Sequence, residues 1–172
     1  MKHVTLPGGE SVPALGMGTW MIGEDAATRA EEIASLQHGI DLGMALIDTA
    51  EMYGEGASEK LVGEAIRGRR EQVFLVSKVY PHNAGRKAAQ AACERSLRRL
   101  GIECLDLYLL HWRGSVPFAE TIEAFETLKA QGKIRAYGVC NFGPGDLAEA
   151  QAARAPIRSN QLPYSLLWRA IE

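Results

Sequence analysis

The chain has 172 residues, of which 47% are hydrophobic and 23% are charged, and its formal net charge at pH 7 is −2. This composition predicts one packed domain over residues 1–172, and the near-neutral charge without a basic, aromatic-rich cluster argues against a nucleic-acid partner. No apolar run approaches the roughly 18 residues of a membrane helix, and the initial MKHVTLPGG lacks the apolar segment of a secretory signal, so we expect a cytoplasmic protein without a membrane partner.

Residues 3–13 predict a β-hairpin, because the turn residues Pro7, Gly8 and Gly9 separate two short strand-like runs. After the hairpin, continuous apolar runs alternate with segments whose apolar residues recur at three- and four-residue spacing, which indicates strands followed by helices. The predicted strands cover residues 14–20, 45–50, 73–79, 105–112, 133–142 and 157–164. The predicted helices cover residues 27–43, 58–68, 86–100 and 144–153, with another that opens at residue 117 and one that begins at residue 165.

Local signals mark the ends of several of these helices. Gly43 and Gly101 follow helical patterns and act as stop signals. Ser58 is a candidate N-cap, and Pro117 suits the first turn of a helix. The apolar residues that the helices are expected to turn toward a core are Ile33, Leu36, Ile40, Cys93, Leu97, Leu100, Ile122, Phe125 and Leu128.

The strands predict a parallel sheet of the TIM-barrel type. Their apolar runs are continuous, which is typical of strands covered on both faces, and strand–helix units with right-handed crossovers give parallel sheets. Polar residues follow most of the strands, which favours a site at the mouth of a (β/α)8 barrel over the single crevice of a doubly wound sheet. Because a complete barrel takes about 250 residues and only six strand–helix units are present, we expect an incomplete barrel.

Four polar residues stand where apolar runs give way to loops: Asp48, Tyr53, Lys78 and His111. A phenol alone is a poor acid near neutral pH, but an adjacent ammonium stabilises its phenolate form. Lys78 could supply that charge, Asp48 could hold Lys78 in an ion pair, and His111 could donate a hydrogen bond in the same cavity. Such a group is suited to protonating a carbonyl oxygen, and a nicotinamide cofactor would then deliver a hydride.

Other interpretations of these residues stay open. Asp48 could cap a loop, Tyr53 could be a packing residue, Lys78 a surface charge and His111 a satisfied core histidine. An isomerase or aldolase on a similar barrel is less favoured, because a Schiff-base lysine would need a pocket without a fixed carboxylate partner.

The segment LIDTAEMYGEGASEKLVGEAI resembles the signature of the aldo-keto reductases: Asp-Thr-Ala, a tyrosine five residues after the aspartate, and Gly-x-Gly-x-Ser-Glu. The lysine of VSKV, the histidine of LYLLHW, and the GVCNF and NQLPYSLL stretches recur in family order. The resemblance runs from the hairpin to the sixth strand. It implies a (β/α)8 barrel whose hairpin covers the amino-terminal end, in a family that reduces carbonyls with NADPH.

The resemblance also implies a role for each of the four residues. Tyr53 would be the general acid, and Lys78 would make it a better proton donor. Asp48 would anchor Lys78, while His111 would orient and polarise the carbonyl of the substrate.

Asn141 and Gln161 match family positions that hydrogen-bond the nicotinamide carboxamide, which would fix the ring face that delivers the hydride. Cys140 stands where a serine is more usual in the family. Because a thiol is a weaker hydrogen-bond donor than a hydroxyl, we expect the carboxamide to be held slightly less tightly. The other cysteines, Cys93 and Cys104, form no Cys-x-x-Cys pair with it. The sequence therefore predicts neither a disulfide framework nor a metal site.

Two tryptophans are candidates for the substrate pocket. Trp20 and Trp112 lie on loops beside the expected mouth, where they would either close the top of the core or, as at similar positions in the family, form apolar walls for small aldehydes and ketones. Arg113 and Tyr80 are weaker candidates for the same pocket.

In the family, two further strand–helix units carry the adenosine and 2′-phosphate contacts. The resemblance implies NADPH as the cofactor, and NADH stays open because those units decide between the two. Two functions remain: an NADPH-dependent carbonyl reductase in a truncated chain, and a non-catalytic aldo-keto-reductase-like fragment or regulatory module.

Six parallel strands would leave two unpaired sheet edges. Inward-facing apolar residues such as Leu46, Ile47 and Leu109 would lose neighbours in the interior of the barrel. We therefore expect a chain that is poorly stable, aggregates, or self-associates through its edges.

Overall fold

Two sheets organise residues 1–172, all of which the computed structural model describes. β1 (His3–Thr5) and β2 (Ser11–Pro13) form the predicted antiparallel hairpin. The larger sheet is parallel, and its strands follow one another in chain order because each connection runs across one face. Its strands are β3 (Met17–Gly18), β4 (Leu46–Asp48), β5 (Phe74–Val79), β6 (Leu105–Leu110), β7 (Ile134–Cys140) and β8 (Asn160–Gln161).

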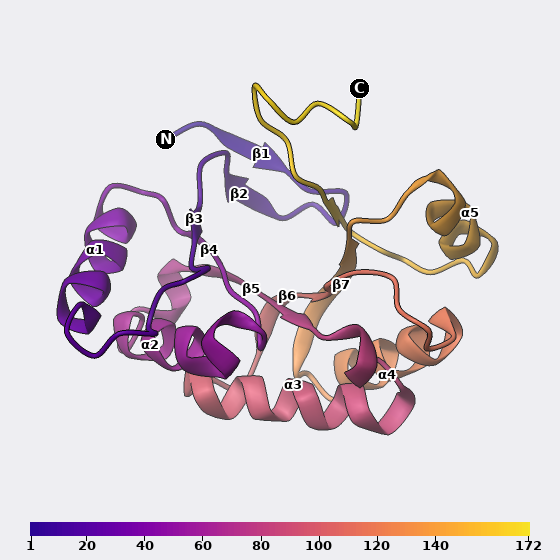
Figure 1. Ribbon diagram of the computed structural model, residues 1–172, viewed down its shortest axis with the longest axis horizontal. Helices are drawn as coiled ribbons and strands as arrows, with labels where there is room; N and C mark the ends of the chain where they lie inside the picture. Colours follow the sequence, from indigo (N-terminus) through magenta and orange to yellow (C-terminus); the bar gives the residue numbers. More distant parts are fainter.

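A helix follows each strand of the larger sheet except the last. These helices are α1 (Arg29–Asp41), α2 (Ala57–Ala65), α3 (Arg86–Leu100), α4 (Phe118–Ala130) and α5 (Pro144–Ala152). Three short 3-10 helices lie in the loops: η1 (Tyr53–Gly56), η2 (Arg70–Gln72) and η3 (Pro81–Asn83). Figure 1 shows α1 to α4 as an arc along one face of the sheet, with the hairpin and the C-terminal residues on the other side. The longest helix, α3, has 15 residues, and no helix of this structure could span a bilayer.

Several predicted helix ends are confirmed and others are wrong. α3 has the predicted bounds, and Gly101 ends it with a φ of 66°. Ser58 is not an N-cap: Gly56 is, with a φ of 89°, and Ser58 lies inside α2. Pro117 is the N-cap of α4 and not a residue of its first turn. The helix predicted from residue 165 is absent, since residues 165–172 contain only a bend, a turn and irregular backbone.

The main core lies between the sheet and its helices. It is a cluster of 26 buried residues that includes Phe125 and Leu128, whereas the opposite face of the sheet carries a cluster of only five, which includes Leu109. The expectation for Ile47 is wrong, because successive side chains of a strand point to opposite faces. Leu46 packs against the small inner cluster, and Ile47 is buried in the main core. Most of the apolar surface that this chain buries is therefore independent of barrel closure.

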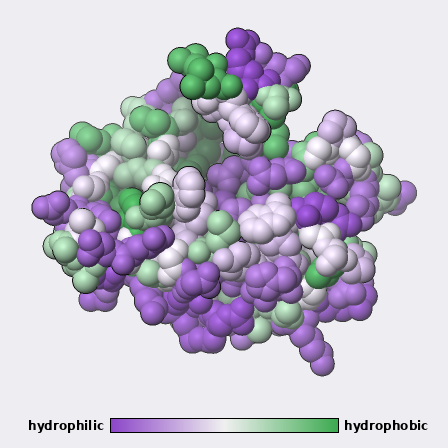
Figure 2. All heavy atoms as spheres, in the orientation of Figure 1, coloured by the Kyte–Doolittle hydropathy of each residue, from purple (hydrophilic) through white to green (hydrophobic).

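The sheet is open, as the sequence predicts. Its edge strands, β3 and β8, have two residues each and pair on one side only. Figure 2 shows a hollow on this open side, beneath hydrophobic residues that project at the top of the molecule. Met1 lies against Gly43, just before β4 begins, so the hairpin is near the amino-terminal end of the strands. The carboxyl-terminal ends of the strands are left free to form a site.

Candidate active site

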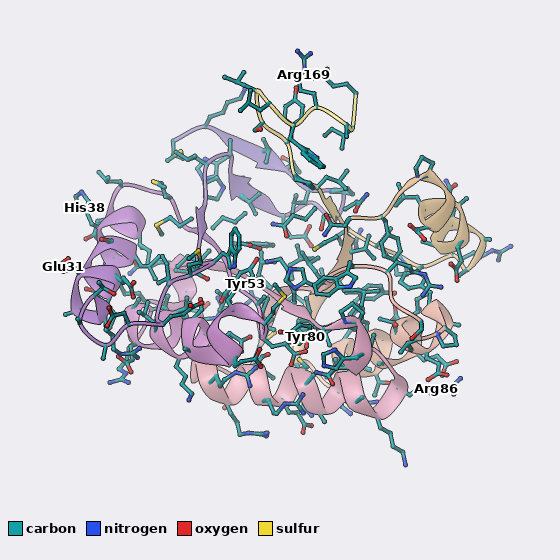
Figure 3. The ribbon with its side chains drawn as sticks, in the orientation of Figure 1. Glu31, His38, Tyr53, Tyr80, Arg86 and Arg169 are labelled. Atoms are coloured by element: carbon teal, nitrogen blue, oxygen red, sulfur yellow. The ribbon has the colours of Figure 1, made fainter.

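The four polar residues singled out from the sequence gather at one edge of the sheet. Asp48 is the last residue of β4, Lys78 lies near the end of β5, and His111 directly follows β6. The carboxyl ends of parallel strands share one edge, so these three side chains converge without any long loop. Tyr53 opens η1, in the loop after β4. Figure 3 shows Tyr53 in the central part of the molecule, whereas Glu31, His38, Arg86 and Arg169 project from the periphery.

Lys78 connects the other members of the group. Its Nζ donates hydrogen bonds to Asp48 Oδ2 at 2.7 Å, to the Thr49 carbonyl oxygen at 2.9 Å and to the Tyr53 hydroxyl at 3.2 Å. These contacts match the three donors of an ammonium. Lys78 is only 2% exposed, so the carboxylate is needed to balance a charge that water does not reach.

The loop after β4 holds Tyr53 against Lys78 through an unusual backbone. Gly54, Glu55 and Gly56 all have positive φ, of 54°, 50° and 89°. This left-handed conformation costs little for glycine but is uncommon for a residue such as Glu55. The Tyr80 hydroxyl donates a hydrogen bond to Glu55 Oε1 at 3.2 Å, which links this loop to the loop after β5.

His111 is a neutral imidazole in this site. Burial, followed by the nearby charge of Lys78, lowers its pKa to about 4. Its ring meets the Tyr53 ring edge-on, with centroids 5.8 Å apart. The buried Nδ1 atom has no hydrogen-bond partner in the structure. A buried polar atom without a partner is costly, and His111 is one of only four side chains that carry one.

The side chains predicted to hold a nicotinamide lie at the ends of β7 and β8. Gln161 Nε2 donates to Asp48 Oδ1 at 3.1 Å, and Cys140 Sγ donates to Gln161 Oε1 at 3.4 Å. Burial raises the pKa of Cys140 to about 12, so its thiol stays protonated. Asn141, with a φ of 60°, donates from Nδ2 to the His111 carbonyl oxygen at 3.0 Å.

All of these side chains line one cleft of about 320 Å³. Its lining consists of Asp48, Tyr53, Lys78, His111, Cys140, Asn141, Gln161, Leu162 and Pro163. A charged acid–base group and a pair of amides thus face the same space, which suits a planar amide-bearing cofactor beside a polar reactant. The structure has no cluster of three or more His, Cys, Asp or Glu side chains arranged for a metal ion.

Comparison with known proteins decides the family. The model of the aldo/keto reductase family matches residues 14–172. The chain belongs to the aldo/keto reductase family. It is 54% identical to methylglyoxal reductase YeaE of Escherichia coli (strain K12) over 99% of its own length, and 39% identical to aldo-keto reductase YhdN of Bacillus subtilis (strain 168) over 92%. It spans 61% and 52% of the length of these two relatives.

Solved structures agree with this assignment. An aldo/keto reductase from Klebsiella pneumoniae, in complex with NADP and acetate, superposes with a TM-score of 0.94 at 50% identity. The match covers 99% of this chain and 61% of that one. The thermostable aldo-keto reductase Tm1743, in complex with the inhibitor epalrestat, gives a TM-score of 0.91 at 41% identity, covering 95% of this chain and 63% of that one. The open sheet therefore corresponds to part of an aldo/keto reductase barrel.

Of the predicted substrate residues, His111 lines the cleft, whereas Trp20 and Trp112 do not. Trp112 packs against His111, with ring centroids 4.9 Å apart, and edge-on against Tyr80 at 6.1 Å. Trp20 follows β3 and is 68% exposed. The guanidinium of Arg113 turns toward α5 and contacts both carboxylate oxygens of Glu149 at 3.2 Å, and its place in the substrate pocket stays a prediction.

Sequence reasoning missed several contributors to this aldo/keto reductase site. Leu162 and Pro163 line the cleft, and their position directly after Gln161 was the available signal. The buried carboxylate of Glu51 accepts hydrogen bonds from the Tyr80 backbone N–H at 2.8 Å and from Asn83 Nδ2 at 3.0 Å. Glu51 thereby fixes the loop after β5. Its place between Asp48 and Tyr53 in the signature segment could have indicated it.

Proposed function

We propose that this aldo/keto reductase reduces small aldehydes or ketones to alcohols, taking a hydride from NADPH and a proton from Tyr53. The observation that carries the proposal is the triple contact of Lys78, whose ammonium lies 3.2 Å from the Tyr53 hydroxyl while Asp48 and the Thr49 carbonyl oxygen hold it in place. NADPH is proposed as the cofactor because the matched Klebsiella pneumoniae structures hold NADP and NADPH.

Different side chains of this site would donate the proton, orient the carbonyl and bind the cofactor. The Tyr53 hydroxyl donates its proton to the carbonyl oxygen, and the Lys78 ammonium stabilises the phenolate that remains. Neutral His111 donates a hydrogen bond to the same oxygen and so orients the carbonyl. Asn141 and Gln161 are suited to the carboxamide of the nicotinamide. Bound NADPH supplies the hydride that adds to the carbonyl carbon.

Small dicarbonyls are the first substrates to examine. The support is the 54% identity to a methylglyoxal reductase. The cleft of about 320 Å³ is consistent with a small reactant beside the nicotinamide. Trp112 and Trp20 would add apolar walls above it.

Cofactor binding and turnover test the proposal in turn. The purified chain is titrated with NADPH while the tryptophan fluorescence is followed, and NADPH oxidation is then measured with methylglyoxal. We expect micromolar, saturable binding, and a loss of turnover of about 10²–10⁴-fold in Tyr53→Phe. Lys78→Met should lose turnover similarly. Lys133→Met is the matched control, because Lys133 also pairs with a carboxylate, Glu94, but on the outer surface.

A different outcome would favour the second candidate, a non-catalytic module of the same fold. The observation in its favour is the sheet edge at β8, which is unpaired on one side directly beside Gln161. No binding at millimolar NADPH, by a chain that remains folded, would overturn the reductase proposal for this polypeptide.

A further inference from the structure

Gln161 takes part in a chain of hydrogen bonds that reaches the proton donor. The Cys140 thiol donates to Gln161 Oε1, and Gln161 Nε2 donates to Asp48 Oδ1. The other oxygen of Asp48 accepts from Lys78, which in turn contacts the Tyr53 hydroxyl. The side chains of β7, β8, β4 and β5 are therefore linked in one network across the cleft.

Two independent constraints fix the direction of the Gln161 amide. A carboxylate only accepts hydrogen bonds, so the amide nitrogen must face Asp48. The Cys140 thiol stays protonated and donates, so the amide oxygen must face Cys140. The remaining amide hydrogen and the remaining lone pair of the oxygen are left for a ligand.

We propose that Gln161 is a positioning residue for the proton donor, through which the nicotinamide carboxamide acts on Asp48, Lys78 and Tyr53. The inference rests on the proposed function and extends it. The amide that would contact the carboxamide also holds Asp48 at 3.1 Å. A ligand that forms a hydrogen bond with the Gln161 amide therefore changes the strength of the ion pair between Asp48 and Lys78. Cys140 acts one step earlier by fixing the direction of the amide.

The contact distances give the sign of the effect. Lys78 Nζ is 2.7 Å from Asp48 and 3.2 Å from the Tyr53 hydroxyl, so the carboxylate already has the closer contact. Without the Gln161 donor, Asp48 has no hydrogen bond on Oδ1 from this amide and attracts Lys78 more strongly. The Lys78 ammonium then moves away from the Tyr53 hydroxyl. The phenolate of Tyr53 then loses stabilisation, and its formation moves to higher pH.

Ultraviolet absorbance of tyrosinate reads this ionisation without any turnover. The chain has five tyrosines, and the pKa values of the other four are raised, by burial first in Tyr80, Tyr108 and Tyr137 and by a hydrogen bond to Glu172 first in Tyr164. Tyr53→Phe identifies the step that belongs to Tyr53.

Four other ionisable groups line the cleft with Tyr53: Lys78, Asp48, His111 and Cys140. Two of them, His111 and Cys140, do not change charge during the titration. With pKa values of about 4 and about 12, His111 and Cys140 each keep one protonation state between about pH 5 and about pH 11, roughly one pH unit inside each value.

Gln161→Leu is the decisive variant. We expect the Tyr53 step to move up by roughly 0.5–1 pH unit, a fraction of the one to three units that an adjacent opposite charge produces. Cys140→Ala should give a smaller shift of the same sign, Cys140→Ser should restore the wild-type value, and Cys140→Ala should add nothing in the Gln161→Leu background. Gln161 is exposed, so its replacement leaves the core intact.

Asn141→Gly is the matched control. Asn141 is the other amide proposed for the carboxamide, yet it donates to the His111 carbonyl oxygen and not to Asp48, and glycine suits its φ of 60°. This variant should weaken NADPH binding and leave the Tyr53 step in place. Equal steps in wild type, Gln161→Leu and Asn141→Gly would overturn the inference. A shift in Gln161→Leu without NADPH turnover in wild type would support the link from Gln161 to Tyr53 while contradicting the proposed function and, with it, the action of the carboxamide.

Discussion

His111 gives the folded chain a predictable response to acid. Burial and Lys78 lower its folded pKa to about 4, whereas an unfolded histidine has a pKa near 6.5. Between these values the unfolded state binds more protons, so the free energy of unfolding falls as the pH is lowered from about 6.5 to about 4. Urea denaturation at pH 7 and pH 5 should show this loss. Above pH 7 the histidine should contribute no pH dependence.

The His111→Gln variant isolates this contribution. It keeps a polar side chain without a titrating ring, while every other ionisable group is unchanged. The stability of wild type relative to His111→Gln should therefore decrease on going from pH 7 to pH 5. An identical pH dependence in the two proteins would contradict the assignment of His111 as a neutral imidazole.

At the level of single residues, the sequence locates side chains better than it locates their partners. Asp48, Lys78 and His111 could be predicted because each follows an apolar run, and strand ends meet at one edge. The Thr49 carbonyl oxygen that accepts from Lys78 has no signature, since every residue carries one. The Gln161–Asp48 contact joins β8 to β4, which lie 113 residues apart in the chain. Only the three-dimensional register of the sheet reveals it.

Two glycines within helices predict opposite effects of the same substitution. In Gly63→Ala the new Cβ atom would lie 2.5 Å from the backbone oxygen of Leu100, where α2 packs on the end of α3. We expect a net loss of about 1–3 kcal/mol, because backbone atoms do not move aside as a flexible side chain does. The change in the urea midpoint, with an unchanged slope, measures it.

Gly145→Ala is the matched control in α5. A Cβ atom added at this glycine would have no other atom within 4 Å, and the φ of Gly145 is not positive. Alanine should therefore stabilise the chain by about 0.5–1 kcal/mol through its helix propensity. If both substitutions stabilised to the same degree, the close contact between α2 and α3 would be refuted.

At the level of elements, helix interiors follow from periodicity while helix starts depend on distant contacts. The C-terminal end of α3 can be predicted because Gly101 is a local stop signal. Ser58 has the composition of an N-cap, but its hydroxyl lies 2.9 Å from the Thr19 carbonyl oxygen and 2.7 Å from Thr19 Oγ1. A contact with the segment after β3 outweighs local capping, and Gly56 is the N-cap of α2 instead. No such competition is visible in the sequence.

The whole molecule divides its apolar residues unevenly between the two faces of the sheet. The 26-residue cluster under the helices is the larger core, and the five-residue cluster on the concave face is small. We therefore expect the 172-residue chain to fold cooperatively around the helix-covered face. The concave face and the edge strands are not covered by the chain's own helices, so they can form contacts with other molecules.

The segment after β8 is the part of this surface most exposed to water. Leu166 and Leu167 are 95% and 98% exposed, and Trp168 beside them is 58% exposed. Together with the unpaired edge of β8 they predict self-association of the isolated chain. In sedimentation velocity the average mass should rise with protein concentration across the micromolar range. A monodisperse monomer at every concentration would contradict this expectation.

Charged substitutions separate the segment after β8 from general surface hydrophobicity. The double variant Leu166→Lys/Leu167→Lys should shift the chain toward monomer, because two ammonium groups cannot be buried in an apolar contact without partners. Leu42→Lys is the matched control, since Leu42 is a leucine 61% exposed at the end of α1, far along the chain from β8. It should leave the association unchanged. If Leu42→Lys reduced the mass equally, the contact would be a nonspecific one spread over the whole surface.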